Sequence, residues 1–400
     1  MRIIRISEIL HDEGVTGLYS RLRFPKAASG GWAPSPITPE VSVTGGRPDL
    51  QDRLRRVLRR AGRQVIRDRR GHELTRFHID PALGPFESYG SNDILVLSRK
   101  AGPHLDQIVQ HGKSAQAVVE MCPERYQKLA AAGMGRDRLF LAAGGLDGFA
   151  LGIYRFLLAA RAVEPDAVDW HSMVPDFPVG HDRMPRLCLS LGEVKFRRQF
   201  FLQQGPRGFV LCDGLRQDPG WIGAAMGYRA MAQACLARGI GQAIFCEDDV
   251  EIAPDFEIRL EKVMAYLKSR DWDVFSGLST HVRQGYHAEQ VESFRGETFL
   301  HLNRTTGMVF NIVNRRALER LAAWRYDEHG RQGITIDAHL ESMPGLRAVT
   351  TMPFLVDHCD ALSSTAWGFS NRRYRGMITN SQQRLAQMAA ARLGDATAAI

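Results

Sequence analysis

The chain has 400 residues, of which 44% are hydrophobic and 24% are charged, and its formal net charge is +8. This composition excludes a disordered or fibrous chain and is typical of a globular protein. The length predicts one large domain with an accessory part. The apolar run "FALGIYRFLLAA" is interrupted by Arg155 and is too short to span a membrane.

The cysteines and the N-terminal residues bear on the compartment. The six Cys are scattered and form no C-x-x-C pair, so neither a zinc site nor a disulfide framework is expected. The start "MRIIRISEIL" has an acidic residue, Glu8, too early for a secretory signal. We therefore expect a cytoplasmic protein in a reducing environment.

Residues 1–72 are predicted to be an extension with a Pro-, Gly- and Ser-rich linker that ends in a basic amphipathic helix. Residues 52–71 contain nine Arg against two Asp. One interpretation places residues 53–70 on the anionic inner face of a membrane. The other is a packed helix with a solvated basic face. Nucleic acid is not an expected partner, because no aromatic residues interleave with the Arg residues.

Residues 73–180 are predicted to form a small accessory α/β unit. Strand-like "DILVLS", "AQAVVEM" and "RLFLAAGG" alternate with helical "HLDQIVQH", "PERYQKLAAAG" and "LDGFALGIYRFLLAARA". Three such strand–helix units predict a parallel sheet. The glycines of "AAGGLDGFALG" suit either a phosphate-binding turn or close packing between strand and helix.

Residues 181–375 are predicted to form a second α/β array with its own sheet, followed by a helical tail over 376–400. The expected strands are "RLCLSL", "GFVLCDG", "QAIFCEDDV" and "DVFSGL". The expected helices are "EVKFRRQFFLQQ", "WIGAAMGYRAMAQACLARG" and "FEIRLEKVMAYLKSR". A strand followed by a helix, repeated, predicts a Rossmann-type arrangement.

The third of these strands carries Glu247, Asp248 and Asp249 at its C-terminal end. In open α/β sheets, ligands bind outside the carboxyl ends of the strands. Adjacent carboxylates repel unless a cation balances them, and Mg²⁺ or Mn²⁺ bound to a diphosphate would do so. The sequence thus predicts a metal–diphosphate site at Asp248 and Asp249. The alternative is a helix cap, a role that Asp255 can fill by itself.

The acidic stretch "CEDDVEIAPDF" resembles the acidic motif of the family 25 glycosyltransferases, the lipopolysaccharide-type galactosyl- and glucosyltransferases and their collagen-modifying relatives. In the same order, "RLCLSLGEVKFRRQFFLQQG", "NRTTGMVFNIVNRRALERL", "TIDAHLE" and "PFLVDHCDALSST" resemble further segments of that family. The resemblance covers about residues 184–370. One segment, "GWIGAAMGYRAMAQACLARG", departs from the family pattern at Ala225, Met226, Gly227 and Tyr228.

The resemblance implies a GT-A fold and a metal-dependent, inverting transfer of a hexose from a nucleotide sugar, with UDP as the expected nucleotide. The expected acceptor is a glycan or a lipid-linked saccharide, and the expected metal is Mn²⁺ or Mg²⁺. It implies metal ligation by Asp248, Asp249 and His358. It places residues of the nucleotide-sugar site at Glu247, Arg197, Arg198, Thr306 and Gly307. A structural ion pair is the alternative for either Arg, and a turn at the start of a strand is the alternative for the Thr–Gly pair.

The resemblance also implies a general base at Asp337, which follows an apolar run in "GITIDAHLE" at the motif position that the family uses near the acceptor. If that segment is extended, His339 shares the face of Asp337. A structural role is the alternative for His358, whose ring Asp357 and Asp360 are placed to orient.

Two other functions are compatible with the sequence. A nucleotidyltransferase or metal phosphohydrolase would use the same acidic strand end, but "SLGEVKFRR" lacks the Gly-rich loop with Lys that such a site needs. A non-catalytic relative that binds a glycan or a partner is compatible with the divergent segment 221–239.

Overall fold

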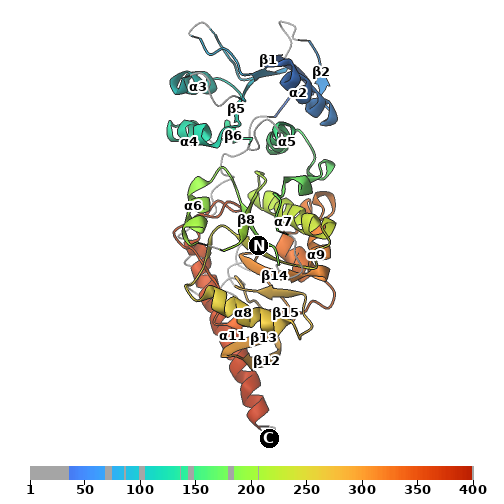
Figure 1. The fold of residues 1–400 in the computed structure, drawn as a ribbon, viewed down its shortest axis with the longest axis vertical. Coiled ribbons are helices and arrows are strands. Elements are labelled where there is room, and N and C mark those ends of the chain that lie inside the picture. Colours follow the sequence, from blue (N-terminus) through green and yellow to red (C-terminus); the bar gives the residue numbers. More distant parts are fainter. Residues whose placement is uncertain are drawn as a thin grey trace, which may run out of the picture.

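The computed structural model describes residues 36–67, 74–84, 87–98, 104–135, 137–142, 148–178, 184–205 and 207–398. Of the three β-sheets in the described residues, the two larger lie one above the other along the long axis of the molecule (Figure 1). The smaller sheet is built from the N-terminal part of the chain, and the larger from the C-terminal part. The protein is thus a mixed α/β protein with one fully parallel sheet and one mixed sheet.

The first sheet has six parallel strands in the order β2-β1-β3-β4-β5-β6. The strands are β1 (Glu40–Gly45), β2 (Gln64–Val65), β3 (Thr75–Ile79), β4 (Asp93–Leu97), β5 (Ala117–Glu120) and β6 (Leu139–Leu141). The helices are α2 (Pro48–Arg60), α3 (Leu105–Gly112), α4 (Pro123–Ala131) and α5 (Phe149–Ala159). The predicted pairs β4–α3, β5–α4 and β6–α5 are confirmed.

The prediction of an irregular extension before residue 73 is wrong for residues 40–65. These residues supply β1, α2 and β2, and β1 lies between β2 and β3 in the sheet. The stretch "VSV" is too short to stand out between Pro- and Gly-rich flanks, so only its pairing with β3 makes it a strand. The six-stranded sheet therefore begins at residue 40 and not within the predicted accessory unit.

Helix α2 contains the first part of the basic helix predicted over residues 53–70. That prediction is wrong for residues 64–65, which form β2, and residues 68–70 lie outside the described residues. Its apolar face, formed by Leu50, Leu54, Val57 and Leu58, is buried against β1 and α5. Arg56, Arg59 and Arg60 lie on the exposed face. This arrangement is the packed-helix alternative, and it leaves the apolar face of α2 no freedom to enter a lipid layer. Contact of the basic face with an anionic surface stays a prediction.

The glycine-rich turn before α5 lies partly outside the described residues, which include neither Gly144 nor Gly145. Gly152 within α5 packs on β6. A Cβ atom added at Gly152 would lie 2.9 Å from the Cβ of Ala142 and 3.1 Å from its carbonyl oxygen. Close packing between strand and helix therefore explains this glycine.

The second sheet has eight strands in the order β12-β13-β15-β11-β14-β9-β7-β8. The strands are β7 (Arg186–Ser190), β8 (Phe209–Asp213), β9 (Gln242–Glu247), β11 (Val274–Ser276), β12 (Ala288–Phe294), β13 (Glu297–Leu302), β14 (Phe310–Asn314) and β15 (Ala348–Met352). Strands β8, β7, β9, β11 and β15 run parallel, and β13 and β14 run against them. The four predicted strands, β7, β8, β9 and β11, are confirmed.

Helices cover the second sheet and connect its strands. They are α6 (Lys195–Gln203), α7 (Gly220–Ala237), α8 (Phe256–Leu267), α9 (Arg315–Ala322), α10 (Ile336–Glu341) and the long C-terminal α11 (Arg372–Ala398). Short helical turns lie at Pro165–Ala167, Trp170–Met173 and Tyr326–Gly330. Within the described residues, no helix combines the length and the apolar character needed to cross a bilayer.

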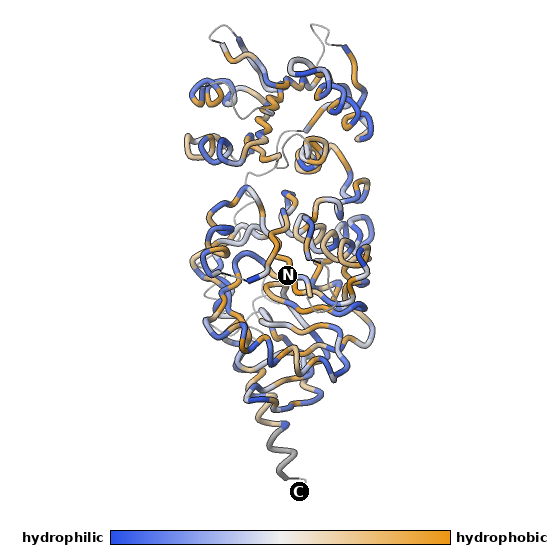
Figure 2. The backbone as a smooth tube through the Cα atoms, in the orientation of Figure 1, coloured by the Kyte–Doolittle hydropathy of each residue, from blue (hydrophilic) through white to orange (hydrophobic). Residues whose placement is uncertain are grey.

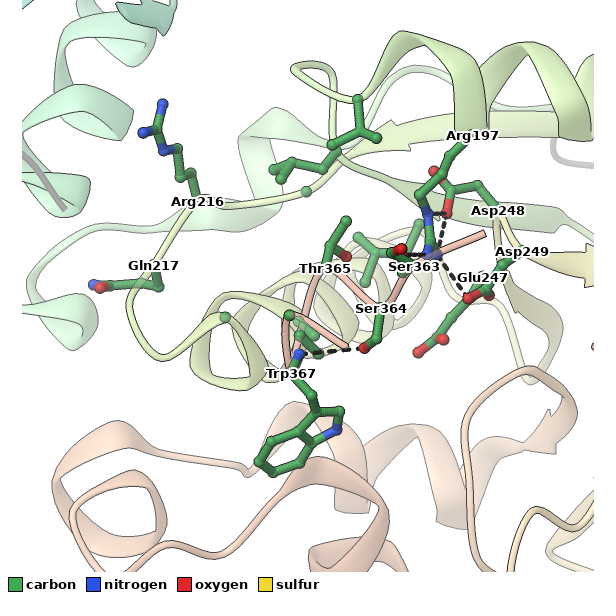
Figure 3. A pocket seen from close by; sticks show the side chains of 18 of the residues that line it. Arg197, Arg216, Gln217, Glu247, Asp248, Asp249, Ser363, Ser364, Thr365 and Trp367 are labelled. Atoms are coloured by element: carbon green, nitrogen blue, oxygen red, sulfur yellow. Dashed lines mark hydrogen bonds and ion pairs between the residues drawn. The ribbon is translucent and has the colours of Figure 1, made fainter. Parts of the chain in front are cut away.

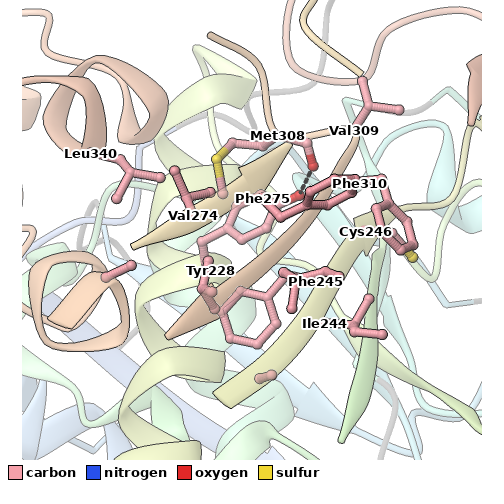
Figure 4. Packing of buried hydrophobic residues seen from close by; sticks show 14 of the residues in the cluster. Tyr228, Ile244, Phe245, Cys246, Val274, Phe275, Met308, Val309, Phe310 and Leu340 are labelled. Carbon is pink, nitrogen blue, oxygen red and sulfur yellow. Dashed lines mark hydrogen bonds between the residues drawn. The ribbon is translucent and has the colours of Figure 1, made fainter. Parts of the chain in front are cut away.

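The core of the larger sheet explains the apolar run before the acids. Ala243, Ile244, Phe245 and Cys246 of β9 are all at most 1% exposed, because the sheet is covered on both faces. Phe245 packs near Tyr228 of α7, whose hydroxyl donates a 2.8 Å hydrogen bond to the carbonyl of Met308 (Figure 4). Apolar segments run through both sheets, and hydrophilic segments lie mostly toward the outside (Figure 2). Strand β9 is thus a buried support that ends at Glu247.

Candidate active site

The candidate site lies where three parallel strands of the larger sheet end. Strand β7 ends at Ser190, β8 at Asp213 and β9 at Glu247. Their carboxyl ends meet at one edge of the sheet, because β7 pairs in parallel with both β8 and β9. The chain then turns through Asp248 and Asp249 into the short strand β10 (Val250–Glu251). Both Asp side chains are buried, at 3–4% side-chain exposure.

Arg197 supplies the positive charge nearest to the acids. Its Nη2 lies 2.6 Å from Asp248 Oδ1 and 2.9 Å from Asp249 Oδ2, and its Nη1 donates a 2.6 Å hydrogen bond to the carbonyl of Ser363 (Figure 3). Burial by itself would lower the pKa of Arg197, but Asp249 and Asp248 outweigh it and raise the pKa above its ordinary value. Arg197 is therefore a permanent buried counterion.

Asp249 receives three donors on a single oxygen. Its Oδ2 lies 2.9 Å from Arg197 Nη2, 3.2 Å from His358 Nε2 and 2.9 Å from Asn371 Nδ2. Burial would raise the pKa of Asp249, but Arg197, His358 and Asn371 together hold it well below its ordinary value. Its Oδ1 is buried and has no hydrogen-bond partner. Asp249 therefore stays ionised and keeps one oxygen for a ligand.

Asp248 and Glu247 differ in whether their carboxylate oxygens are engaged in hydrogen bonds. Asp248 Oδ1 accepts from Arg197 Nε at 2.7 Å, and its Oδ2 accepts from Ser190 Oγ at 2.7 Å. Glu247 is only partly buried by its neighbours and lines two cavities. Desolvation, followed by repulsion from Asp249, raises the pKa of Glu247 above its ordinary value. A second cation beside Glu247 would oppose that shift.

Two cavities meet at these acids. The larger has a volume of about 640 Å³ and lies between the start of α6, the loop after β8 and residues 363–368 (Figure 3). The smaller has a volume of about 300 Å³ and is lined by residues of α7, α10 and α11 and by Thr306 and Gly307. Both cavities are lined by Glu247, Asp249 and Trp367. A ligand that fills both would place its middle at the carboxylates.

Two helices begin at the rim of the larger cavity. The N-cap residues of α6 and α7 are Val194 and Pro219, and neither makes a side-chain capping bond. Both residues line the cavity. Uncapped N–H groups and the helix dipole favour an anion at such a place. The larger cavity thus has an electropositive rim.

The segment around Asp337 is helical, so the condition under which His339 would share the face of Asp337 is not met. Asp337 lies in the first turn of α10 and lines the smaller cavity, where Thr335 Oγ1 donates to its carboxylate. His339 is buried elsewhere, with Nε2 at 3.0 Å from the carbonyl oxygen of Arg320. A helical turn separates two residues that an extended chain would have placed on one face.

Other predicted residues take distinct positions. Arg198 binds Asp213 and Ser190 and is not among the residues that line the cavities, so the ion-pair alternative describes it. Gly307 has a φ of +99°, which a glycine adopts without strain, and a Cβ there would lie 2.7 Å from Thr280 Oγ1. Thr306 and Gly307 both line the smaller cavity.

His358 reaches the site because the short strand β16 (Asp357–His358) pairs with β10. The expectation that Asp357 and Asp360 orient its ring is wrong, because both carboxylates bind Arg375 instead. The ring of Tyr374 packs edge-on against His358 at 5.1 Å between centroids. His358 is therefore held by Asp249 and by packing.

The sequence did not point to Ser190, Asn371 or the segment 363–368. Ser190 and Asn371 each bind one of the acids, from the end of β7 and from the residue before α11. The "SST" of 363–365 lies in a family-like segment, which was the one available signal.

The expected divalent metal fits only part of the predicted ligand set. Asp249 keeps one free buried oxygen and Glu247 faces both cavities, whereas both oxygens of Asp248 are engaged. His358 directs Nε2 at Asp249, and its Nδ1 has no partner, so its role as a ligand stays a prediction. In the described part of the chain, no three His, Cys, Asp or Glu side chains are gathered to hold a metal ion. Glu247 and Asp249, completed by substrate oxygens, are the pair that fits.

His339 predicts a measurable pH dependence of stability. Burial, followed by repulsion from Arg320 and His329, lowers its pKa to about 4, whereas a His in an unfolded chain has a pKa of about 6.5. Between these values the unfolded chain binds more protons, so the free energy of unfolding falls as the pH drops from about 6.5 to about 4. His339→Gln should flatten this slope in urea unfolding at several pH values. The exposed His287→Gln should keep it, and equal slopes in all three proteins would contradict the assignment.

Comparison with known proteins gives no family. No protein-family model matches the chain, and no curated protein matches it. Among solved structures, the crystal structure of A197 from STIV is similar at 20% identity, over 42% of this chain and 84% of that chain, with a TM-score of 0.27. The class that the fold and site define is a mixed α/β protein with a charged site at the carboxyl edge of its larger sheet.

Proposed function

We propose that the protein is a glycosyltransferase that moves a hexose from a nucleoside diphosphate sugar to a glycan or lipid-linked saccharide. One observation carries the proposal: Glu247 and Asp249 lie where a cavity of about 640 Å³ meets one of about 300 Å³. A sugar nucleotide has its diphosphate in the middle, between a larger nucleoside and a smaller sugar. The strand order, with β14 antiparallel between β9 and β11, supports a GT-A-like sheet.

The larger cavity suits the nucleoside diphosphate. The uncapped N-termini of α6 and α7 offer N–H groups to phosphate oxygens. Arg197 adds a fixed positive charge, which stays in place because two carboxylates hold it. A fixed charge costs no reorganisation when negative charge develops on the departing diphosphate.

The smaller cavity suits the transferred sugar and the acceptor. It is lined by aromatic side chains, on which sugar rings can pack, and by polar groups: Trp221, Trp367, Phe369, Tyr374, Thr306 and Asp337. Asp337 is the candidate general base, with Thr335 orienting its carboxylate. As the acceptor oxygen bonds to the anomeric carbon, Asp337 takes its proton and the bond to the diphosphate breaks. Attack from the face opposite the leaving group inverts the anomeric centre.

A divalent ion held by Glu247 and Asp249 would neutralise the leaving diphosphate as a Lewis acid. The local charge supports such an ion, because the carboxylates of residues 247–249 outnumber the single guanidinium of Arg197 by two. Asp248 has a different part. It holds Arg197 and Ser190 in position and so orients the counterion.

Three of the four positions that depart from the family pattern lie in the core and outside both cavities. Ala225 and Met226 are at most 1% exposed within the core and do not line either cavity. Gly227 packs on Leu189, where an added Cβ would lie 2.7 Å from Cδ1. Tyr228, the fourth departure, does line the smaller cavity, so three of the four changes lie in the core and one alters the cavity lining.

A thermal-shift screen of UDP-, GDP-, ADP- and CMP-linked sugars, each with and without Mn²⁺, tests the proposal. One nucleotide should stabilise the protein selectively, by about 2.7 kcal/mol at a concentration 100 times the dissociation constant. A larger shift with Mn²⁺ would support the metal. A transfer assay with the same four kinds of nucleotide sugar follows the screen. If none of them shifts the melting temperature and none is turned over, the proposed function is contradicted.

Phe196 should stack on the nucleobase. It lines the larger cavity at the start of α6, yet it is 51% exposed. Phe196→Ala should weaken nucleotide binding by about 5- to 150-fold, the range for losing one base–aromatic contact. Leu202→Ala is a matched control, because Leu202 lies on the same helix, is 52% exposed and does not line the cavity. Calorimetric titration with UDP measures both variants, and equal affinities would contradict the stacking role.

A further inference from the structure

We infer that the six-stranded N-terminal unit is part of the nucleotide site, because Arg155 and its neighbours hold one wall of the larger cavity in position. This inference rests on the proposed function for the identity of the ligand. It assigns Arg155, which does not line the cavity, as a positioning residue. The larger domain, which is the part of the chain that builds the eight-stranded sheet, would then depend on the N-terminal unit for binding of the sugar donor.

The wall in question is the loop between β8 and α7, residues 214–219. All six of its residues line the larger cavity: Gly214, Leu215, Arg216, Gln217, Asp218 and Pro219. Arg216 and Gln217 extend from this loop toward the N-terminal unit in Figure 3. The conformation of this loop therefore sets the shape of the cavity on that side.

The N-terminal unit binds this loop at successive points. Arg155 of α5 donates from Nη2 to the carbonyl of Gly214 at 2.8 Å, and its Nη1 lies 3.8 Å from Asp213 Oδ2. Further along, Gln217 Nε2 donates to the carbonyl of Leu158 at 3.3 Å. Arg161 Nη2 donates to the carbonyl of Asp218 at 3.2 Å. The attachment thus spans the loop from its first residue to its fifth.

Arg216 fixes the middle of the loop by a bond in which the loop residue is the donor and the N-terminal unit is the acceptor. Its Nη1 donates to the carbonyl of Leu139 at 2.9 Å, and its guanidinium lies 4.0 Å from the ring centroid of Phe140. Arg155 and Arg216 are buried, at 7% and 4% exposure. Buried, charge-assisted hydrogen bonds are stronger than exposed ones, so these contacts restrict the loop.

The larger domain holds the loop at both ends and buries Leu215 in its core. Gly214 N–H donates to the carbonyl of Ser190 at 2.8 Å, and Gly220 begins α7 against the carbonyl of Thr365. Polar side chains of the central residues bind across to the N-terminal unit. Loss of the bond from Arg155 should therefore loosen the wall without disturbing the acids on the opposite side.

Arg155→Met in the full chain tests the inference with two readouts. Hydrogen exchange of the amides of residues 214–218, measured without nucleotide, should become at least about 10-fold faster. The dissociation constant for UDP should rise by about 10-fold, which matches the loss of one buried charge-assisted bond. In a transfer assay KM for the nucleotide sugar should rise and kcat should stay within about two-fold. Arg155→Lys, which keeps a donor and the charge, should restore part of the affinity.

Two further variants keep the test decisive. Arg161→Ala changes an exposed residue, so it should fold normally and raise exchange only near residue 218. Arg186→Met is the matched control, because it removes a two-point pair with Glu257, at 2.6 and 3.0 Å, that does not touch the loop. Unchanged loop exchange in Arg155→Met, or an equal rise in Arg186→Met, would overturn the inference. If the wild-type protein binds no nucleotide, the proposed function fails, and the exchange experiment still decides whether the N-terminal unit holds the loop.

Discussion

Replacement of Asp249 by Asn should abolish sugar transfer and leave the fold intact. The Asn oxygen can take the place of Oδ2 and still accept from Arg197, His358 and Asn371, so the buried network persists. The Asn NH₂ group then occupies the place of Oδ1, which has no hydrogen-bond partner. The amide NH₂ group, whose hydrogens carry partial positive charge, then replaces the free anionic Oδ1 of Asp249 and repels a cation.

The expected loss in kcat is at least about 100-fold, the effect of removing one preorganised electrostatic group from an active site. Calorimetric titration with Mn²⁺ should show the loss of ion binding without any turnover assay. Glu251→Gln is the control, because Glu251 is exposed, follows the same acidic run and lies outside both cavities. Wild-type turnover and Mn²⁺ binding in Asp249→Asn would exclude Asp249 from the metal site.

Replacement of Arg197 by Met should cost the protein a large share of its stability. Arg197 has a side chain only 4% exposed and is the shared partner of Asp248 and Asp249. Without it, two buried carboxylates remain close together with no fixed counterion. Breaking a buried ion pair by removing one partner typically costs about 3–5 kcal/mol, because the other charge stays desolvated.

Urea unfolding followed by near-ultraviolet circular dichroism measures this loss. Arg198→Met provides the comparison on the same helix. Arg198 also binds a carboxylate at 2.6 Å, but its side chain is 27% exposed, so the expected loss is about 1 kcal/mol or less. Similar losses for the two variants would contradict the role of Arg197 as the buried counterion. Arg197→Met should also release the segment after Ser363, whose carbonyl loses its donor.

Many helices and strands of the fold could be predicted because the sequence pattern of each lies within a single segment. Strand β9 is an unbroken apolar run and α7 is a long helix that follows Pro219, and each pattern is complete within its own segment. The alternation of strands and helices predicted a parallel sheet in the N-terminal unit and a second sheet with acids at the carboxyl end of one strand. Where a strand depends on a distant partner, prediction failed, as for β1, whose short apolar stretch becomes a strand by pairing with β3.

The candidate site was predictable only in part. Glu247, Asp248 and Asp249 followed from one segment, and the resemblance added Arg197, His358 and Asp337. The separate roles of these residues could not be predicted, because they depend on partners far away in the sequence. Arg197 lies 51 positions from Asp248, and Asn371 lies 122 positions from Asp249. Asp337 and His339 would have shared a face only in an extended segment, and residues 336–341 instead form helix α10, which packs against α9 and α7.

The sequence by itself determined that a buried strand delivers three acids to a sheet edge, since apolar periodicity and covalent order fix that outcome. The tertiary structure decided which acid is neutralised, which oxygen stays free and which cavities flank them. It also decided that a loop of the larger domain is held by the smaller one. Those features depend on charges and hydrogen bonds between residues far apart in the chain, and a desolvated charge is stable only where folding brings its partner within contact.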